Sequence, residues 1–333
     1  MQIYQYVLIT ILIIVIEIVY LKIANRLNIV DKPNLRSSYK TPVICGGGII
    51  FLFAIWLWTC FCGFQYPWFL IGVTLIAAIS FVDDIHPLPV SLRLLVQVIS
   101  MGMIFQEWNI LFWPNWWILF LAFILCVGII NAYNFMDGIN GILGGYSMAV
   151  LLPLLFLNHK YSFVEFGLIE VMAIAGLVFC FFNFRKRALC CAGDVGSVGM
   201  AFFVVFVIGK LIITTGDFSY IILLALYGVD SILTIIHRIM LHENLGQAHR
   251  KHCYQLMANE LQIPHVKVSL FYTFTQLLIS TGFILTGNNI KSHYIYSVVV
   301  VVCLIMAYIL FMKKYYHLHE EYLKKMNNEY NHS

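Results

Sequence analysis

The sequence predicts an all-α polytopic membrane protein with about eleven transmembrane helices. Hydrophobic residues make up 61% of the 333 residues and charged residues only 11%, whereas a soluble domain carries about 25% charged residues. The apolar runs are continuous rather than alternating, which favours helices over a membrane β-barrel. Two adjacent carboxylates, Asp83 and Asp84, end one of these runs. Because a charge at the bilayer centre costs about 2.5–3.5 kcal/mol, this pair must lie at an interface or hold a positive partner.

Eleven segments come close to the roughly 17–25 residues that a spanning helix needs. They are residues 4–24, 44–62, 67–82, 91–107, 116–134, 141–157, 163–183, 197–214, 218–236, 268–286 and 293–312. The first segment has no basic region before it and no small-residue cleavage site, so we expect a retained helix rather than a removed signal peptide. We therefore expect one transmembrane domain, 1–312, followed by a polar cytoplasmic tail, 313–333.

The lysines and arginines set the orientation. With eleven helices, seventeen of these residues fall on one side of the membrane and only Lys160, Lys210 and Lys291 on the other. Cytoplasmic loops carry the excess of Lys and Arg, so the N-terminus is expected outside and the C-terminus in the cytoplasm. The expected location is the bacterial inner membrane. The cytoplasmic connections are then 25–43, 83–91, 134–141, 184–197 and 237–267. The nine cysteines form no C-x-x-C pair and are expected to be free, buried thiols rather than zinc ligands or disulfides.

The polar signals converge on these cytoplasmic connections. In the first, Arg36 and Lys40 precede Gly46-Gly47-Gly48, which reads either as a packing turn or as a phosphate site. In the second, Asp83-Asp84 is followed by Arg93; such a pair either ends a helix at the water interface or holds a cation.

Two further signals are unusual for membrane segments. The stretch 131–141 holds three asparagines, Asp137 and two glycines, which favours ligand binding by Asn134, Asp137 and Asn140 over helix packing. Asp194 lies between glycines where a helix begins, so its carboxylate could face a cation. The fifth connection contains His249, Arg250 and His252, for which phosphate binding is a better use than zinc binding.

In this order, the five signals resemble the bacterial polyprenyl-phosphate N-acetylhexosamine-1-phosphate transferases, the MraY/WecA family, over roughly residues 30–255. The motifs that carry the resemblance are Asp83-Asp84, Asn134-x-x-Asp137-Gly and Gly193-Asp194-x-Gly-Ser. The resemblance implies transfer of a sugar 1-phosphate, N-acetylhexosamine 1-phosphate by default, from a UDP-sugar to polyprenyl (undecaprenyl) phosphate, with release of UMP. Magnesium is the implied cofactor, with manganese as the alternative ion.

The resemblance also implies roles for single residues. Asp83, Asp84 and Asp137 would be catalytic, and Asp194, Asp83 and Asp84 would hold the metal. The substrates would be bound by Asn134, Asn140, Asp137, Arg36, Lys40, Arg93, His249, Arg250 and His252. Phosphoryl transfer between two anions mainly requires neutralised charge and in-line positioning, which suits such a set.

Two departures from the family pattern point to a branch of it. Asn140 stands where many members have a second aspartate, and the histidine motif reads His249-Arg250-Lys-His252-Cys. The variant resembles the WbpL-like enzymes of O-antigen or capsule synthesis, which implies the initiating step of a cell-surface polysaccharide. The expected partners are the two substrates and membrane lipids, with no nucleic acid, in a monomer or a homodimer.

Two other classes compete with the transferase. A polytopic transporter of a nucleotide sugar or another anionic solute is the main alternative, although its polar groups would more often lie near the midplane. A CDP-alcohol phosphatidyltransferase ranks last, because its Asp-Gly-x-x-Ala-Arg signature is missing from the sequence.

Overall fold

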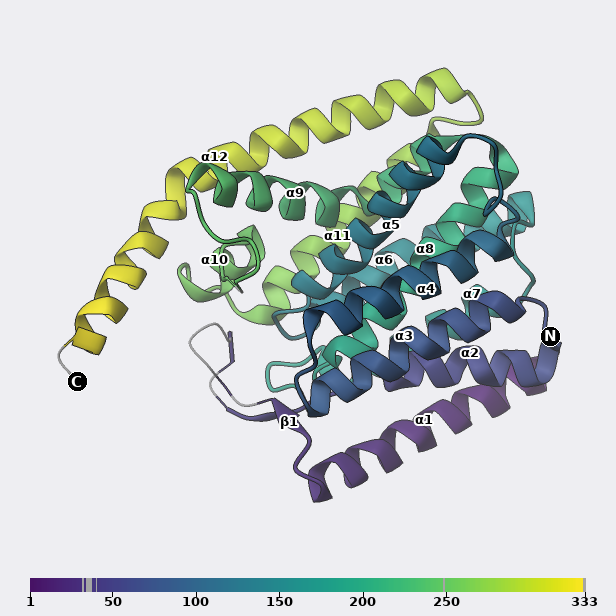
Figure 1. The fold of residues 1–333 in the computed structure, drawn as a ribbon, viewed down its shortest axis with the longest axis horizontal. Helices are drawn as coiled ribbons and strands as arrows, with labels where there is room; N and C mark the ends of the chain where they lie inside the picture. The colour runs from purple at the N-terminus through teal and green to yellow at the C-terminus, as the bar shows by residue number, and fades with distance from the viewer. Residues whose placement is uncertain (32, 34–37, 40, 248, 332–333) are drawn as a thin grey trace.

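The computed structural model describes residues 1–31, 33, 38–39, 41–247 and 249–331 and is 76% helical, with almost no strands in that part of the chain (Figure 1). Two short strands, β1 (Val30–Asp31) and β2 (Val43–Ile44), pair antiparallel. The helices are α1 (Ile3–Arg26), α2 (Ile49–Cys62), α3 (Pro67–Ile85), α4 (Val90–Glu107), α5 (Trp116–Phe135), α6 (Ile142–Tyr161), α7 (Leu168–Asn183), α8 (Gly193–Thr215), the 3-10 helix η1 (Phe218–Leu224), α9 (Ala225–Met240), α10 (Cys253–Asn259), α11 (His265–Leu285) and α12 (Ile290–Asn331).

The predicted all-α membrane fold is confirmed. Within the described residues, nine helical segments are long and apolar enough to cross a membrane, and two shorter apolar helices, α2 and α7, accompany them. These segments lie close to the eleven that the sequence predicted. The second one starts later than expected, because Val43 and Ile44 pair with β1 and Gly46 adopts a φ of +83°, which a glycine reaches without steric cost.

Helix α8 lies at the centre of the bundle and is buried along most of its length. On one side, a Cβ atom added to Gly48 at the start of α2 would lie only 2.2 Å from the Cα of Gly196. On another side, the ring of Phe69 from α3 stacks on Phe202 and Phe206, with centroid distances of 6.0 and 4.1 Å. Small residues and stacked rings thus fix α2 and α3 against α8.

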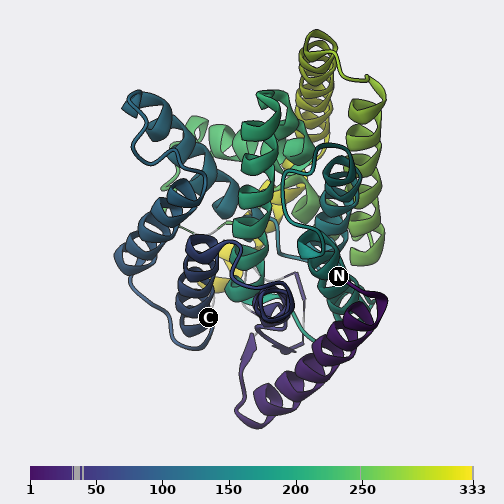
Figure 2. The same ribbon diagram turned by 90° about the vertical axis from the view of Figure 1, so that its right-hand side faces the viewer.

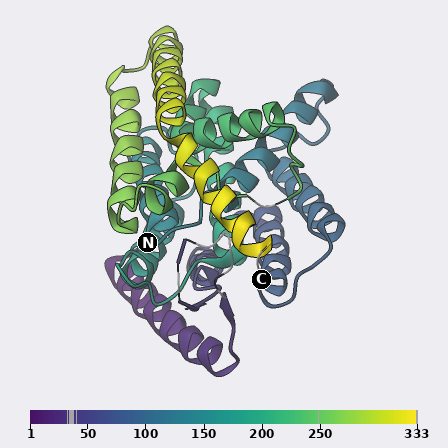
Figure 3. The ribbon, with the colours of Figure 1, turned by 90° about the vertical axis from the view of Figure 1, so that its left-hand side faces the viewer.

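The ends of α3 and α5, the start of α8, the β1–β2 hairpin and α10 gather at one end of the bundle (Figures 1 and 3). We call this the acidic end, because it holds Asp83, Asp84, Asp137 and Asp194. The N-terminus lies at the opposite end, on the right in Figure 1 and on the side that faces the viewer in Figure 2, and Met1 contacts Gly167 before α7 there. Helix α12 runs back to the acidic end and continues to Asn331, so the residues predicted as a polar tail extend this helix.

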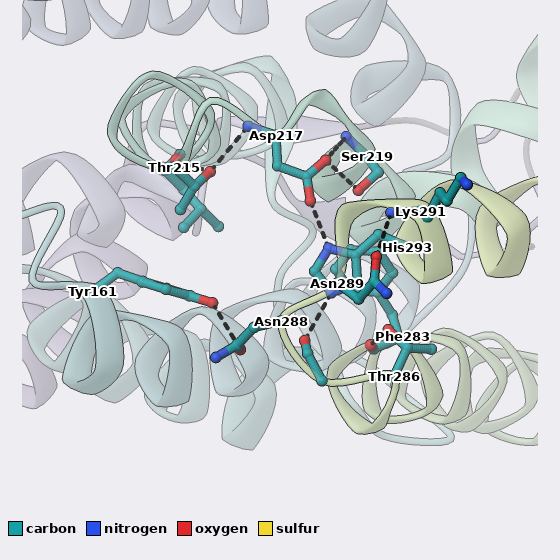
Figure 4. A network of polar contacts seen from close by, with 12 residues as sticks. Tyr161, Thr215, Asp217, Ser219, Phe283, Thr286, Asn288, Asn289, Lys291 and His293 are labelled. Carbon is teal, nitrogen blue, oxygen red and sulfur yellow. Dashed lines mark hydrogen bonds and ion pairs between the residues drawn. The ribbon is translucent and has the colours of Figure 1, made fainter.

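A polar network ties the opposite end together (Figure 4). The Asp217 carboxylate accepts hydrogen bonds from the backbone and hydroxyl of Ser219, at 2.9 and 2.6 Å. It also pairs with Nδ1 of His293 at 2.5 Å, while Nε2 of that ring lies 2.9 Å from the Gly287 carbonyl. Burial by itself raises the pKa of Asp217, but His293 and Ser219 outweigh it and hold this pKa below its ordinary value. The network therefore anchors the start of α12 to the start of η1.

Candidate active site

A cavity of about 320 Å³ lies at the acidic end. Its wall includes six of the residues that the sequence singled out: Asp83, Asp84, Asn134, Asp137, Asn140 and Asp194. Five further polar residues of the wall were not predicted as site residues: Asp31, Tyr39, Cys45, Asn183 and Cys191. Asp31 could have been found from its place in the first predicted cytoplasmic loop, whereas a single asparagine at the end of an apolar helix gives no such signal.

The Asp84 carboxylate caps the first turn of α8. Its two oxygens accept hydrogen bonds from the backbone N–H groups of Asp194, at 2.8 Å, and Val195, at 3.1 Å. A helix N-terminus leaves such N–H groups unpaired and favours a negative charge beside them. Gly193 makes the approach possible, because it has a φ of +71° and an added Cβ would lie 2.5 Å from an Asp84 oxygen. Asp84 thus places the start of α8, and with it Asp194, at the cavity wall.

Asp83 is held by the connection between α3 and α4. One oxygen accepts the backbone N–H of Leu88 at 2.6 Å, and the other pairs with Arg93 Nη1 at 2.7 Å. The same Arg93 nitrogen lies 3.6 Å from Asp194. A guanidinium between two carboxylates offsets their mutual repulsion, so Arg93 keeps Asp83 and Asp194 close to each other.

Asn134 and Asp137 come from the end of α5 and the turn after it. The Asn134 side-chain oxygen accepts a hydrogen bond from the Ser197 hydroxyl of α8 at 2.9 Å. Asp137 is half-buried in the cavity wall, and its partial removal from water, together with the negative charges of Asp194 and Asp84, raises its pKa to about 7. A positive charge beside such a carboxyl group, for example a metal ion, would stabilise its ionised form and lower its pKa.

Asn140 and Asn183 shape the turn after α5 rather than project free amides into the cavity. The Asn140 amide donates to the Arg185 carbonyl at 3.2 Å. Asn183 accepts the Gly141 N–H at 2.7 Å and donates to the Cys190 carbonyl at 2.8 Å. These bonds connect the turn before α6 to the segment that leads into α8.

The predicted basic residues divide into three groups. Arg36 and Lys40 lie outside the described residues. Arg93 reaches the acidic cluster, as shown above. The third group, His249, Arg250 and His252, does not line the cavity.

His252 and its neighbour His249 pack beside the cavity rather than in its wall. Nδ1 of His252 lies 3.3 Å from Asp230, a buried residue of α9 that the sequence reasoning missed. Tyr272 donates a hydrogen bond of 2.6 Å to the same carboxylate. Burial, the neighbouring His252 and the nearby Arg238 lower the pKa of His249 to about 3, so this ring is neutral near pH 7.

The acidic wall can be tested against the implied magnesium ion. Among the described residues, no three His, Cys, Asp or Glu side chains are grouped as ligands for a metal. Mg²⁺, however, takes only one or two carboxylates and completes its shell with water and substrate phosphate. Both oxygens of Asp83 and of Asp84 already accept hydrogen bonds, and fewer donors reach Asp137 and Asp194. The carboxylates therefore fit one magnesium ion held by Asp194 and Asp137. The oxygens of Asp83 and Asp84 are shared with hydrogen-bond donors of the protein.

The fold and the site define a class: a multi-pass helical membrane protein with a carboxylate-rich cavity at one end of the bundle. Comparison with known proteins is consistent with this class. Residues 66–214 match the model of glycosyl transferase family 4, a range that contains Asp83, Asp84, Arg93, Asn134, Asp137 and Asp194. The resemblance predicted from the motifs is confirmed over this range, where the chain is similar to glycosyl transferase family 4.

The curated relatives that the chain matches carry closely similar names. The undecaprenyl-phosphate alpha-N-acetylglucosaminyl 1-phosphate transferase of Escherichia coli is 25% identical over 212 residues, or 56% of each chain. The protein of that name from Yersinia pestis is 29% identical over 147 residues, covering 38% of this chain and 39% of its own. The probable undecaprenyl-phosphate N-acetylglucosaminyl 1-phosphate transferase of Bacillus subtilis is 23% identical over 270 residues, or 74% of each chain. The match thus spans little more than half the length of the Escherichia coli relative.

Proposed function

We propose that the protein transfers a sugar 1-phosphate from a UDP-sugar to polyprenyl phosphate, giving a polyprenyl-diphospho-sugar and UMP. The observation that carries the proposal is the cavity at the acidic end, where Asp83, Asp84, Asp137 and Asp194 converge at the ends of apolar helices. A site at the ends of membrane-spanning helices would be within reach of a soluble nucleotide sugar and of a lipid phosphate held in the bilayer. The family match and the names of the relatives agree with this reaction.

In the proposed reaction, an oxygen of the lipid phosphate attacks the phosphorus that carries the sugar. A new phosphorus–oxygen bond forms, the bond to the bridging oxygen breaks, and UMP leaves with that oxygen. No general base is required, because a phosphate monoester is already largely ionised near pH 7. A magnesium ion, when bound, would neutralise charge on the diphosphate.

The residues of the chain would supply position and charge. Asp194 and Asp137 would hold the ion, because they have the fewest other donors. Asp84 fixes the backbone on which Asp194 stands. Arg93 would keep the carboxylates of Asp83 and Asp194 close together and would place a positive charge beside the cavity. Catalysis would then rest on preorganised charge, as is usual for phosphoryl transfer.

The acidic end is assigned to the cytoplasmic face of a bacterial inner membrane. Two of the three cations predicted outside lie at the opposite end of the bundle: Lys291 beside Asn289 (Figure 4), and Lys160, whose ammonium group donates to the Asn288 side chain. In the predicted topology, the excess of Lys and Arg falls on the side that carries the acidic cluster, which supports a cytoplasmic face under the positive-inside rule. The donor would be an N-acetylhexosamine nucleotide, used to initiate an O-antigen or capsule polysaccharide.

Release of UMP tests the proposal. Purified protein would be given undecaprenyl phosphate, Mg²⁺ and a panel of UDP-sugars, with Asp194→Asn as the inactive variant and the exposed Glu165→Gln, at the opposite end, as its control. We expect Asp194→Asn to lower the rate at least about 100-fold, because one charge at the reacting phosphates is lost, and Glu165→Gln to leave it unchanged. Accumulation of the nucleotide sugar in sealed vesicles without any UMP would instead establish a transporter.

A further inference from the structure

The last part of α12 leaves the bundle at the acidic end and lies against α10, crossing in front of the bundle in Figure 3. It also contacts residues 249–252, which we call the basic segment. Three side chains of α12 make these contacts: Tyr316, His319 and Tyr322. They are spaced by three residues, so they share one side of the helix.

Arg250 is fixed from two sides by this surface. Its Nη2 donates to the Glu260 carboxylate at 3.0 Å, and its guanidinium carbon lies 4.3 Å from the centre of the Tyr322 ring. Nδ1 of His319 lies 2.8 Å from the same Glu260 oxygen. Arg250, Glu260 and His319 are all nearly buried, so the ion pair and the cation–π contact are shielded from water.

Lys251 is fixed by the same surface. Its ammonium group pairs with Glu243 and donates to the Tyr316 hydroxyl at 2.9 Å. Glu243 in turn pairs with Arg238 from the end of α9 at 3.2 Å. Two consecutive cations of the chain thus take their positions from one face of α12.

Helix α10 connects the basic segment to the cavity. The Tyr254 hydroxyl donates to the Phe135 carbonyl at 2.8 Å, in the turn that leads to Asp137. At the other end of α10, the Asn259 amide donates to the Ser38 hydroxyl at 3.0 Å, next to a residue of the cavity wall. A shift of the basic segment would therefore be transmitted to two edges of the site.

The basic segment also keeps polar atoms that the protein leaves without partners. Nδ1 of His249, Nε of Arg250 and Nε2 of His252 are buried and, among the described residues, have no hydrogen-bond partner. Buried polar atoms in proteins are nearly always paired, so three unpaired nitrogens within four residues of the chain are groups that a ligand could satisfy.

We propose that the α12 face of Tyr316, His319 and Tyr322 positions the basic segment and thereby sets the affinity of the site for its nucleotide substrate, without contacting the reacting atoms. This inference rests on the proposed function. The basic segment lies beyond the end of α9, outside the apolar helices, whereas a lipid phosphate is tethered to the membrane. Both of its cations are already paired with carboxylates, so the three unpaired nitrogens are the groups that would suit the polar atoms of a soluble nucleoside diphosphate.

Four variants test the inference. Tyr322→Ala removes the ring over Arg250, and Tyr322→Phe keeps it as the conservative control. His319→Ala removes a partner of Glu260, and His317→Ala changes an exposed histidine two residues away. The measurements are kcat, the KM for each substrate in UMP release, and the Kd for UDP by calorimetry. The Kd requires no turnover.

We expect Tyr322→Ala and His319→Ala to raise the KM of the UDP-sugar and the Kd of UDP about tenfold, the effect of losing one such contact. The kcat and the KM of the polyprenyl phosphate would stay within about twofold, and both controls would match the wild type. An unchanged KM and Kd, an equal rise in both KM values, or a Tyr322→Phe protein as weak as Tyr322→Ala would overturn the inference. A wild type that releases no UMP would overturn the proposed function instead, and the Kd values would then decide on the positioning role.

Discussion

Replacing Asp84 by asparagine should affect both stability and activity, because this side chain caps α8. The carboxylate accepts two backbone N–H groups, from Asp194 at 2.8 Å and from Val195 at 3.1 Å. Asparagine keeps only one oxygen and turns an NH₂ group toward the second N–H, which then has no acceptor.

The size of the effect follows from these two contacts. A buried N–H without an acceptor costs about 1–3 kcal/mol. Loss of a negative charge at a helix N-terminus costs a further ~0.3–1 kcal/mol. We therefore expect Asp84→Asn to reduce the free energy of unfolding by about 1.3–4 kcal/mol. Asp194→Asn should reduce it by less than about 0.5 kcal/mol, since the nearest cation to that carboxylate is Arg93, at 3.6 Å.

The assay combines denaturant unfolding in detergent with UMP release for the two variants and the wild type. Both variants should lose activity, but only Asp84→Asn should unfold at a lower denaturant concentration. Because the two residues face the same cavity, general damage to the site would affect them equally. Equal stability of the two variants, or a larger loss for Asp194→Asn, would refute the capping role.

Two further predictions concern packing and pH. Gly48→Ala should destabilise the protein by about 1–3 kcal/mol, because its new Cβ would lie 2.2 Å from a backbone carbon of α8. Gly102→Ala, whose Cβ would meet nothing within 4 Å, should be neutral or slightly stabilising in the same unfolding measurement. Folding lowers the pKa of His249 from 6.5 to about 3. Between pH 3 and pH 6.5 this histidine is therefore protonated in the unfolded chain and neutral in the folded protein. The free energy of unfolding consequently declines as the pH falls below 6.5. His249→Gln should flatten that decline in unfolding temperatures measured between pH 7 and 5, and an unchanged slope would contradict the assignment.

The structure gathers much of the candidate site that the sequence indicated. One cavity is lined by five of the predicted residues: Asp83, Asp84, Asn134, Asp137 and Asp194. The sequence could indicate that they lie near one another, because counting the apolar helices places all of their segments on the same side of the membrane. That count depends only on the lengths of apolar runs, which are a local property of the chain.

The hydrogen-bond and ion-pair partners of these residues could not be predicted from the sequence. The sequence presented Asp83-Asp84 as one pair, but the structure directs Asp83 to Arg93 and Asp84 to the start of α8. Similarly, Arg250 was predicted to bind phosphate, and its nearest partner is Glu260, beneath a ring of α12. A hydrogen bond between residues 111 positions apart leaves no periodicity or spacing in the sequence.

By itself, the sequence determined the all-α membrane class and the approximate bounds of the apolar helices, and it indicated the acidic residues that line the cavity. It could do so because helix formation and membrane partitioning depend on about twenty consecutive residues. Only the tertiary structure decided which carboxylate caps α8, that Asp230 lies buried beneath His252, and that α12 continues past the apolar region onto α10. Those features depend on how helices distant in the chain pack together, and hence on side-chain shape and pairing rather than on local composition.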